Sequence, residues 1–125
     1  MKRVLVVDDD MEIRVMLRRM LGHLGYDIVE ADDSAKAVVE CKRQKIDLVI
    51  MDILMKQGKG GIEGIIDISR DMPGTKILAI SGGGHTGHPT QYLDLAAQVG
   101  ADKVMPKPIN VKKLIKEIVA LIGEP

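Results

Sequence analysis

Residues 46–52 read Ile46-Asp47-Leu48-Val49-Ile50-Met51-Asp52, an apolar run that ends in a carboxylate. Two further runs, Val4-Leu5-Val6-Val7 and Ile77-Leu78-Ala79-Ile80, are equally aliphatic. Short continuous runs of this kind are typical of strands that are buried on both faces of a parallel sheet. We therefore predict buried strands at Ile46–Met51 and at these two runs, with weaker strand candidates at Asp27–Glu30 and Lys103–Met105.

Helical patterns separate the predicted strands. Apolar residues within Ile13–Leu24 recur every three or four positions, which places them in one stripe of a helix that Gly25 would end. The segment Val111–Ile122 repeats this pattern, and Asn110 is its expected N-cap. Three less regular helices are expected at Ser34–Arg43, Ile62–Asp71 and Thr90–Val99.

Strand and helix thus alternate along the whole chain. Such alternation predicts an α/β fold, a doubly wound parallel sheet with helices on both faces and right-handed crossovers. Five strand–helix units fit the flavodoxin-like arrangement, with strand order 2-1-3-4-5 and five helices. The 125 residues are the size of one domain.

The amino-acid composition argues against several classes of protein. Hydrophobic residues make up 46% and charged residues 29%, and 18 basic residues balance 18 acidic ones, so the basic excess of a nucleic-acid binder is missing. No apolar run approaches the roughly 18 residues of a membrane span, and the start does not resemble a signal peptide. A single cysteine, Cys41, excludes an intramolecular disulfide and fits the cytoplasm; we expect it to be a buried helix residue.

Polar residues stand where the predicted strands end, and parallel strands bring their carboxyl ends to one edge of the sheet. These residues are Asp8-Asp9-Asp10, Asp52, Ser81 and Lys107. Crowded carboxylates repel one another unless a cation is bound, and Mg²⁺ prefers oxygen ligands. We predict a Mg²⁺ site, with Mn²⁺ as the alternative ion, formed by Asp9, Asp52, Asp8 and the backbone carbonyl of Leu54.

A carboxylate held at such a site can accept a phosphoryl group. Lys107 would neutralise charge on the transferred oxygens, and the Ser81 hydroxyl could donate a hydrogen bond to one of them.

The chain resembles the receiver domain of response regulators over essentially all of its 125 residues. The resemblance lies in Val4–Asp10, Asp47–Asp52, Ile80-Ser81-Gly82, and Gly100-Ala101-Asp102 followed by Lys107-Pro108. It implies that Asp8 and Asp9 are the acid pair that holds the metal, that Asp52 is the phosphoacceptor, and that Ser81 and Lys107 are the switch hydroxyl and the phosphate-contacting lysine. In the family, the peptide bond that corresponds to Lys107–Pro108 is often cis.

The resemblance also implies partners. The expected phosphoryl donor is a sensor histidine kinase or a phosphotransfer protein. A downstream protein would bind the face formed by the fourth helix, fifth strand and fifth helix. The 125 residues would be a receiver domain without an output domain, making no direct contact with nucleic acid or membrane. It would catalyse only its own phosphorylation and dephosphorylation and would not otherwise be an enzyme.

Several positions depart from the family pattern. Val104 stands where receivers usually have a switching aromatic residue, and Ile109 stands where phenylalanine is common. The loop Lys56–Gly61 is one residue longer and lacks the usual proline, and Gly82-Gly83-Gly84 follows Ser81. Neither Leu54 nor Gly83, each two residues past a site residue, can position an attacking water, so we expect self-dephosphorylation to get no help there.

Alternatives remain open at this point. Asp8 or Asp9 could be a helix N-cap, and Asp52 with Lys107 could form a salt bridge in a degenerate receiver that acts only through protein contacts. A flavodoxin would share the fold, but the acids after the first strand would repel a flavin phosphate. A phosphatase would use the Asp8-x-Asp10 spacing. We expect Lys56 and Lys59 to be solvated and His85 and His88 to hold no metal.

Overall fold

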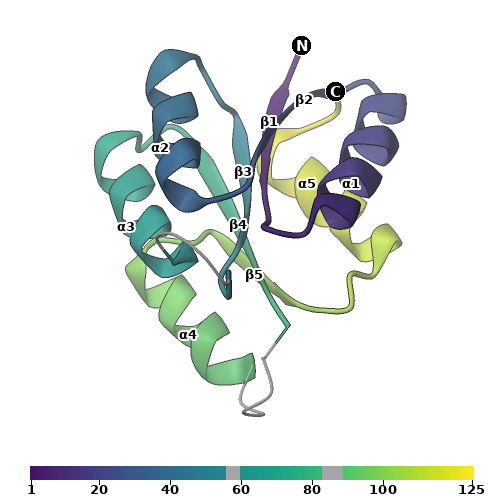
Figure 1. Cartoon of the computed structure of the whole chain (residues 1–125). Helices are drawn as coiled ribbons and strands as arrows, with labels where there is room; N and C mark the ends of the chain where they lie inside the picture. The colour runs from purple at the N-terminus through teal and green to yellow at the C-terminus, as the bar shows by residue number, and fades with distance from the viewer. Residues whose placement is uncertain (56–59, 83–88) are drawn as a thin grey trace.

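The structure, a computed structural model, describes residues 1–55, 60–82 and 89–125, with the backbone alone at residues 89 and 90 (Figure 1). Its elements follow the predicted alternation. In chain order they are β1 (Arg3–Val7), α1 (Met11–Leu24), β2 (Asp27–Ala31), α2 (Ser34–Arg43), β3 (Leu48–Asp52), α3 (Gly61–Asp71), β4 (Lys76–Ser81), α4 (Pro89–Val99), β5 (Lys103–Pro106) and α5 (Val111–Ile122).

The five strands form one parallel sheet in the order β2-β1-β3-β4-β5, which confirms the predicted fold class. Helices α1 and α5 cover one face, and α2, α3 and α4 cover the other (Figure 1). The register pairs Val7 with Met51 and Ser81 with Pro106, so β1, β3, β4 and β5 end at the same edge of the sheet. The polar residues that follow these strands therefore come together.

Alternate residues of the central strands enter two separate cores, as period-two side-chain geometry requires. Leu48 and Ile50 face α1 and α5, where Leu17 and Leu114 are buried. Their neighbours in β3, Val49 and Met51, face the other layer. There they belong to one core with residues of α2, α3 and α4, namely Cys41, Ile65 and Ala96. Both faces of β3 are thus covered, which explains its uninterrupted apolar sequence. Cys41 is buried in α2, as predicted.

Strand β3 differs from its predicted bounds: it begins two residues later than expected and includes Asp52. Ile46 is buried outside the strand, where its carbonyl accepts a hydrogen bond from the Thr75 hydroxyl at 2.8 Å. Asp47 lies next to it, and its carboxylate accepts the Arg3 N–H at 2.8 Å. The Asp47 backbone still bonds to both neighbouring strands: its N–H donates to the Arg3 carbonyl at 2.9 Å, and its carbonyl accepts the Lys76 N–H at 3.0 Å. Among the described residues, no helix is long and apolar enough to cross a membrane.

Helix ends follow the local chemistry. Asp10 caps α1 by accepting the Glu12 N–H at 2.9 Å, which starts the helix at Met11. Gly25 ends α1 with φ 113°, a left-handed conformation that favours glycine. Asn110 caps α5 through the Lys113 N–H at 3.1 Å, as predicted. The cap before α1 is thus Asp10, so the N-cap interpretation of Asp8 and Asp9 is wrong.

Candidate functional site

Three carboxylates meet at the carboxyl edge of the sheet. Asp8 follows β1 directly, Asp9 is the next residue, and Asp52 is the last residue of β3. One oxygen from each of the three side chains lies within 4.8 Å of the others. The structure thus brings together the acids that the sequence placed at separate strand ends.

Asp8 is held from several sides. One carboxylate oxygen, Oδ1, accepts the Asp10 N–H at 2.9 Å, and the other, Oδ2, accepts from Lys107 Nζ at 3.2 Å. Its backbone N–H donates to the Ala31 carbonyl at 3.2 Å, which ties the residue to the end of β2. Because the side chain is 5% exposed, these contacts fix a carboxylate that water scarcely reaches.

Asp52 is less well satisfied. It is 3% exposed, and its Oδ2 lies 3.5 Å from Lys107 Nζ. The other oxygen, Oδ1, is buried and has no hydrogen-bond partner among the described residues. A buried carboxylate oxygen without a partner is costly, by roughly 1–3 kcal/mol or more. The all-oxygen donor set around this atom fits Mg²⁺, which would satisfy it.

The charges of the site shift its pKa values. Burial, with the negative charge of Asp8 added to it, raises the pKa of Asp52 to about 7, although Lys107 acts in the opposite direction. For Lys107, burial disfavours the charge, but Asp52 and Asp8 outweigh it and raise the pKa above its usual value. Lys107 is therefore a cation at neutral pH, and the carboxylates carry more negative charge than one lysine can balance.

The acids border a small pocket of about 350 Å³, lined by Asp8, Asp9, Asp10, Asp52, Leu54 and Lys107. A larger hollow of about 780 Å³ lies elsewhere, along α1 and against Ile115, and its lining includes Met11, Met16, Met20 and Leu24. Its lining is mainly aliphatic and also includes Glu12, Arg19 and His23, but it does not bring several acids together as the site at Asp52 does. The chemistry of the chain is therefore assigned to the smaller, polar pocket.

Ser81 and Lys107 reach this edge from neighbouring strands. Ser81 is the buried last residue of β4, and its carbonyl accepts the Lys107 N–H at 2.9 Å. That bond extends the pairing of β4 with β5 by one step and fixes the backbone from which the Lys107 side chain reaches Asp8 and Asp52. The peptide bond between Lys107 and Pro108 is cis, as the resemblance suggested.

The sequence model described as the response regulator receiver domain matches residues 4–119. The chain belongs to this family. Receivers are signalling domains of two-component response regulators, and the acidic cluster of Asp8, Asp9 and Asp52 fits their metal and phosphoaspartate site. Membership of the receiver family decides against the flavodoxin and phosphatase interpretations.

Individual relatives agree with this assignment. The chain is 32% identical over 118 residues to the chemotaxis protein CheY of Thermotoga maritima, covering 94% of each protein. It is 30% identical over 124 residues to the transcriptional regulatory protein CpxR of Escherichia coli, covering 98% of this chain but spanning only 50% of that relative's length. The crystal structure of the response regulator TrrA of Thermotoga maritima, in complex with Mg²⁺-BeF, superposes with a TM-score of 0.83 at 32% identity, covering 97% of this chain and 99% of that one.

Two positions that we expect to depart from the family pattern, Val104 and Ile109, lie in described parts of the structure. Val104 lies half-buried in β5 and packs on the core beneath α4, and Ile109 packs on the opposite core. Further expectations concern residues that the structure does not describe, namely Lys56, Lys59, Gly83, Gly84, His85 and His88. Predictions for those residues stay predictions.

Two contacts that support the receiver site were not predicted. The Arg14 guanidinium donates to the Asp8 carbonyl at 2.6 Å, and the Ser34 hydroxyl donates to the Gly60 carbonyl at 3.1 Å. Gly61 also approaches the backbone of β3 closely, since an added Cβ would lie 2.7 Å from Ile53 Cα. The glycines at Gly61 and Gly64 were a visible signal for close packing, whereas nothing in the sequence pointed to Arg14.

Proposed function

We propose that this receiver accepts a phosphoryl group on Asp52 and thereby switches a protein-binding face. The observation that carries the proposal is Asp52 Oδ1, a buried carboxylate oxygen without a partner among the described residues, beside two further acids and a lysine. A buried carboxylate without a hydrogen-bond partner destabilises the fold unless the site binds another group. Buried acids of this kind are typical of functional sites.

The donor set defines the cation. Asp8, Asp9, Asp52 and the backbone carbonyl of Leu54 would hold Mg²⁺, or Mn²⁺ in its place, as oxygen ligands. When bound, the ion supplies neutralisation of the charge on phosphoryl oxygens. Lys107 supports this from the other side, because its ammonium already lies within ion-pair distance of both Asp8 and Asp52.

The transfer itself is a substitution at phosphorus. An oxygen of the Asp52 carboxylate forms a bond to phosphorus while the N–P bond of a phosphohistidine donor breaks, and the imidazole nitrogen keeps the electron pair and takes up a proton. The donor would be a sensor histidine kinase or a phosphotransfer protein. Hydrolysis of the acyl phosphate by water later restores the carboxylate, so the chain would catalyse only its own phosphorylation and dephosphorylation.

The output would pass through Ser81. Its hydroxyl would move toward the phosphoryl group on Asp52, and the strand end that carries it pairs with β5. We propose that α4, β5 and α5 form the face that a downstream protein binds, that all 125 residues belong to the receiver, and that it works in the cytoplasm without contacting nucleic acid or membrane. With Val104 in place of an aromatic residue, the switch would act through backbone movement.

Phosphorylation tests the proposal. Wild type, Asp52→Asn and Asp71→Asn would be incubated with Mg²⁺ and acetyl phosphate, and separately with a phosphorylated histidine kinase. Asp71 is an exposed control carboxylate at the end of α3 that pairs with Arg70 at 2.9 Å. We expect label on wild type and Asp71→Asn and none on Asp52→Asn. Undiminished label on Asp52→Asn would refute the assignment, and an unlabelled wild type would favour a degenerate receiver with a structural Asp52–Lys107 salt bridge.

A further inference from the structure

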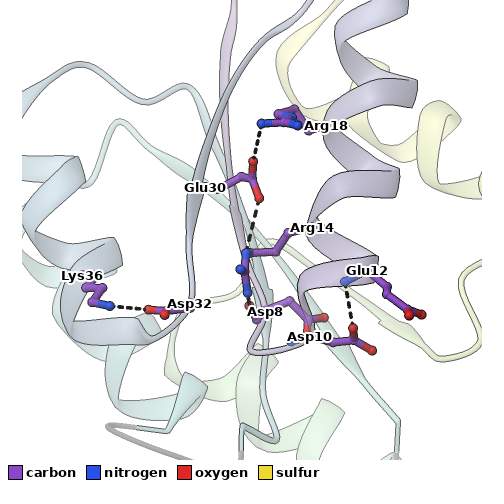
Figure 2. A network of polar contacts seen from close by, with 8 residues as sticks. All are labelled: Asp8, Asp10, Glu12, Arg14, Arg18, Glu30, Asp32 and Lys36. Atoms are coloured by element: carbon purple, nitrogen blue, oxygen red, sulfur yellow. Dashed lines mark hydrogen bonds and ion pairs between the residues drawn. The ribbon is translucent and has the colours of Figure 1, made fainter.

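Arg14 in α1 makes an unusual contact with the acid loop. Its Nη1 donates to the backbone carbonyl of Asp8 at 2.6 Å, across the turn that separates β1 from α1 (Figure 2). The Arg14 side chain is only 15% exposed, so the contact is largely shielded from water. A charged donor that binds a carbonyl at this distance is a strong restraint on the backbone.

The same guanidinium is oriented by a second partner. Nε of Arg14 donates to Glu30 Oε1 at 3.3 Å, and Glu30 Oε2 also pairs with Arg18 Nη1 at 3.1 Å (Figure 2). Glu30 lies in β2, so this pair connects α1 to the edge strand of the sheet. The planar arginine fork can make both contacts at once, which the single ammonium of a lysine cannot do with the same geometry.

The contact completes the restraint of Asp8. Its N–H, its carbonyl and its two carboxylate oxygens are bonded to Ala31, Arg14, Asp10 and Lys107, respectively. Of these four bonds, the one from Arg14 fixes the peptide plane between Asp8 and Asp9. The direction in which the Asp9 side chain leaves the backbone depends on that plane.

We propose that Arg14 is a positioning residue for the cation site, which fixes the Asp8–Asp9 peptide so that both carboxylates remain directed at Asp52. The inference rests on the proposed function, because it concerns the same Mg²⁺ site. The positive charge of Arg14 would by itself oppose a cation nearby, and Glu30 offsets that charge. The Arg14–Glu30 pair therefore delivers a hydrogen bond to the acid loop with less net charge than Arg14 alone would bring, although Glu30 is shared with Arg18.

Titration with Mg²⁺ alone tests this role, with backbone amide NMR shifts as the signal. Arg14→Met keeps an apolar stem and removes the fork, and Arg18→Met is the matched control, since Arg18 shares Glu30 and is half exposed. We expect Arg14→Met to raise the Kd for Mg²⁺ about tenfold, the size of effect seen when a supporting contact to a metal ligand is lost. Arg18→Met should leave the Kd unchanged, and Arg14→Lys should fall between Arg14→Met and wild type.

A second readout needs no metal. The Asp10 N–H donates to Asp8 Oδ1, so its hydrogen exchange reports how well the loop is held. In Mg²⁺-free protein, exchange at Asp9 and Asp10 should be faster in Arg14→Met than in Arg18→Met. Equal exchange and equal Kd in these two variants would overturn the inference. If wild type bound no Mg²⁺, the proposed function would fail, and the exchange rates would still judge Arg14.

Glu30→Gln provides a further test should Arg14→Met not fold. It keeps an acceptor oxygen for Arg14 and removes the charge that offsets the guanidinium. We expect a higher Kd for Mg²⁺ in this variant than in Arg18→Met, and a Kd equal to that of wild type would contradict the proposed role.

Discussion

The ammonium of Lys107 lies 3.5 Å from Asp52 Oδ2 and also contacts Asp8 Oδ2, at 3.2 Å. One cation thus contacts two buried acids of the site. The arrangement leaves net negative charge at the carboxyl edge of the sheet. The effects of substitutions at this edge follow from that charge.

Removing the Lys107 charge should slow phosphorylation and strengthen cation binding. In Lys107→Ala, we expect phosphorylation by acetyl phosphate to slow about 10²-fold, because a positioned charge on the transferred oxygens is lost. Mg²⁺ should still bind, and more tightly, because a competing cation has gone. Rates from phosphate labelling and a Mg²⁺ titration check both effects. Lys103→Ala, which removes an exposed pair with Glu117, is the control; loss of Mg²⁺ binding in Lys107→Ala would contradict the account.

Asp52 should make the stability of the Mg²⁺-free protein depend on pH. Burial and then Asp8 raise the pKa of Asp52 from 3.8 to about 7 in the folded protein. Since the folded state binds this proton more tightly than the unfolded chain, the destabilisation is absent below the unfolded pKa and complete above about pH 7. The free energy of unfolding should therefore fall as pH rises between these values, by a few kcal/mol.

Denaturant unfolding of wild type and Asp52→Asn across this pH range isolates the contribution of Asp52 to the free energy of unfolding. Asp52→Asn should lack the fall and be the more stable of the two at about pH 8, where the wild-type carboxylate is charged. Millimolar Mg²⁺ should remove most of the wild-type fall, because the ion replaces the proton. Parallel curves for the two proteins would show that Asp52 is not the group that titrates.

Gly61 should tolerate no side chain, whereas its neighbour Gly60 should. A Cβ at Gly61 would overlap the Asp52 carbonyl oxygen and lie 2.7 Å from Ile53 Cα, whereas a Cβ at Gly60 meets nothing within 4 Å. We expect Gly61→Ala to lower the free energy of unfolding by about 1–3 kcal/mol and Gly60→Ala to change it little. Urea unfolding measures both, and equal losses would mean that the close approach of α3 to β3 is not what requires glycine.

Loss of the phosphoryl group should depend on Leu54. Leu54 lines the site pocket, and its side chain has no polar group with which to orient a water. Leu54→Asn supplies an amide there, and we expect aspartyl-phosphate decay to become faster than in wild type. The decay of the label after donor removal measures this rate, and an unchanged rate would refute the idea that this position limits self-dephosphorylation.

The fold could be predicted because each β-strand of the interior, such as β3, is apolar on both faces, and parallel pairing brings strand ends to one edge. The gathering of Asp8, Asp9 and Asp52 follows from that topology alone. The start of β3 was less predictable, because Ile46 is as apolar as a strand residue yet lies before the strand, where its carbonyl accepts a hydrogen bond from Thr75, distant in sequence.

The supporting contacts of the site could not be predicted for a related reason. Arg14 lies on a helix where an arginine is ordinarily a solvated residue, and only the packing of α1 against β2 brings Glu30 and the Asp8 carbonyl within its reach. The sequence interpretation placed a possible cap of α1 at Asp8 or Asp9, and this was wrong. Backbone geometry decides it, since Asp10 is the residue whose side chain meets the Glu12 N–H.

The position of the phosphoryl group tests the central claim most directly. After phosphorylation with acetyl phosphate and Mg²⁺, borohydride reduces an aspartyl phosphate to homoserine, which tandem mass spectrometry locates in the sequence. The account predicts homoserine at Asp52 and nowhere else in the chain. Homoserine at Asp8 or Asp9 with an intact Asp52 would contradict it.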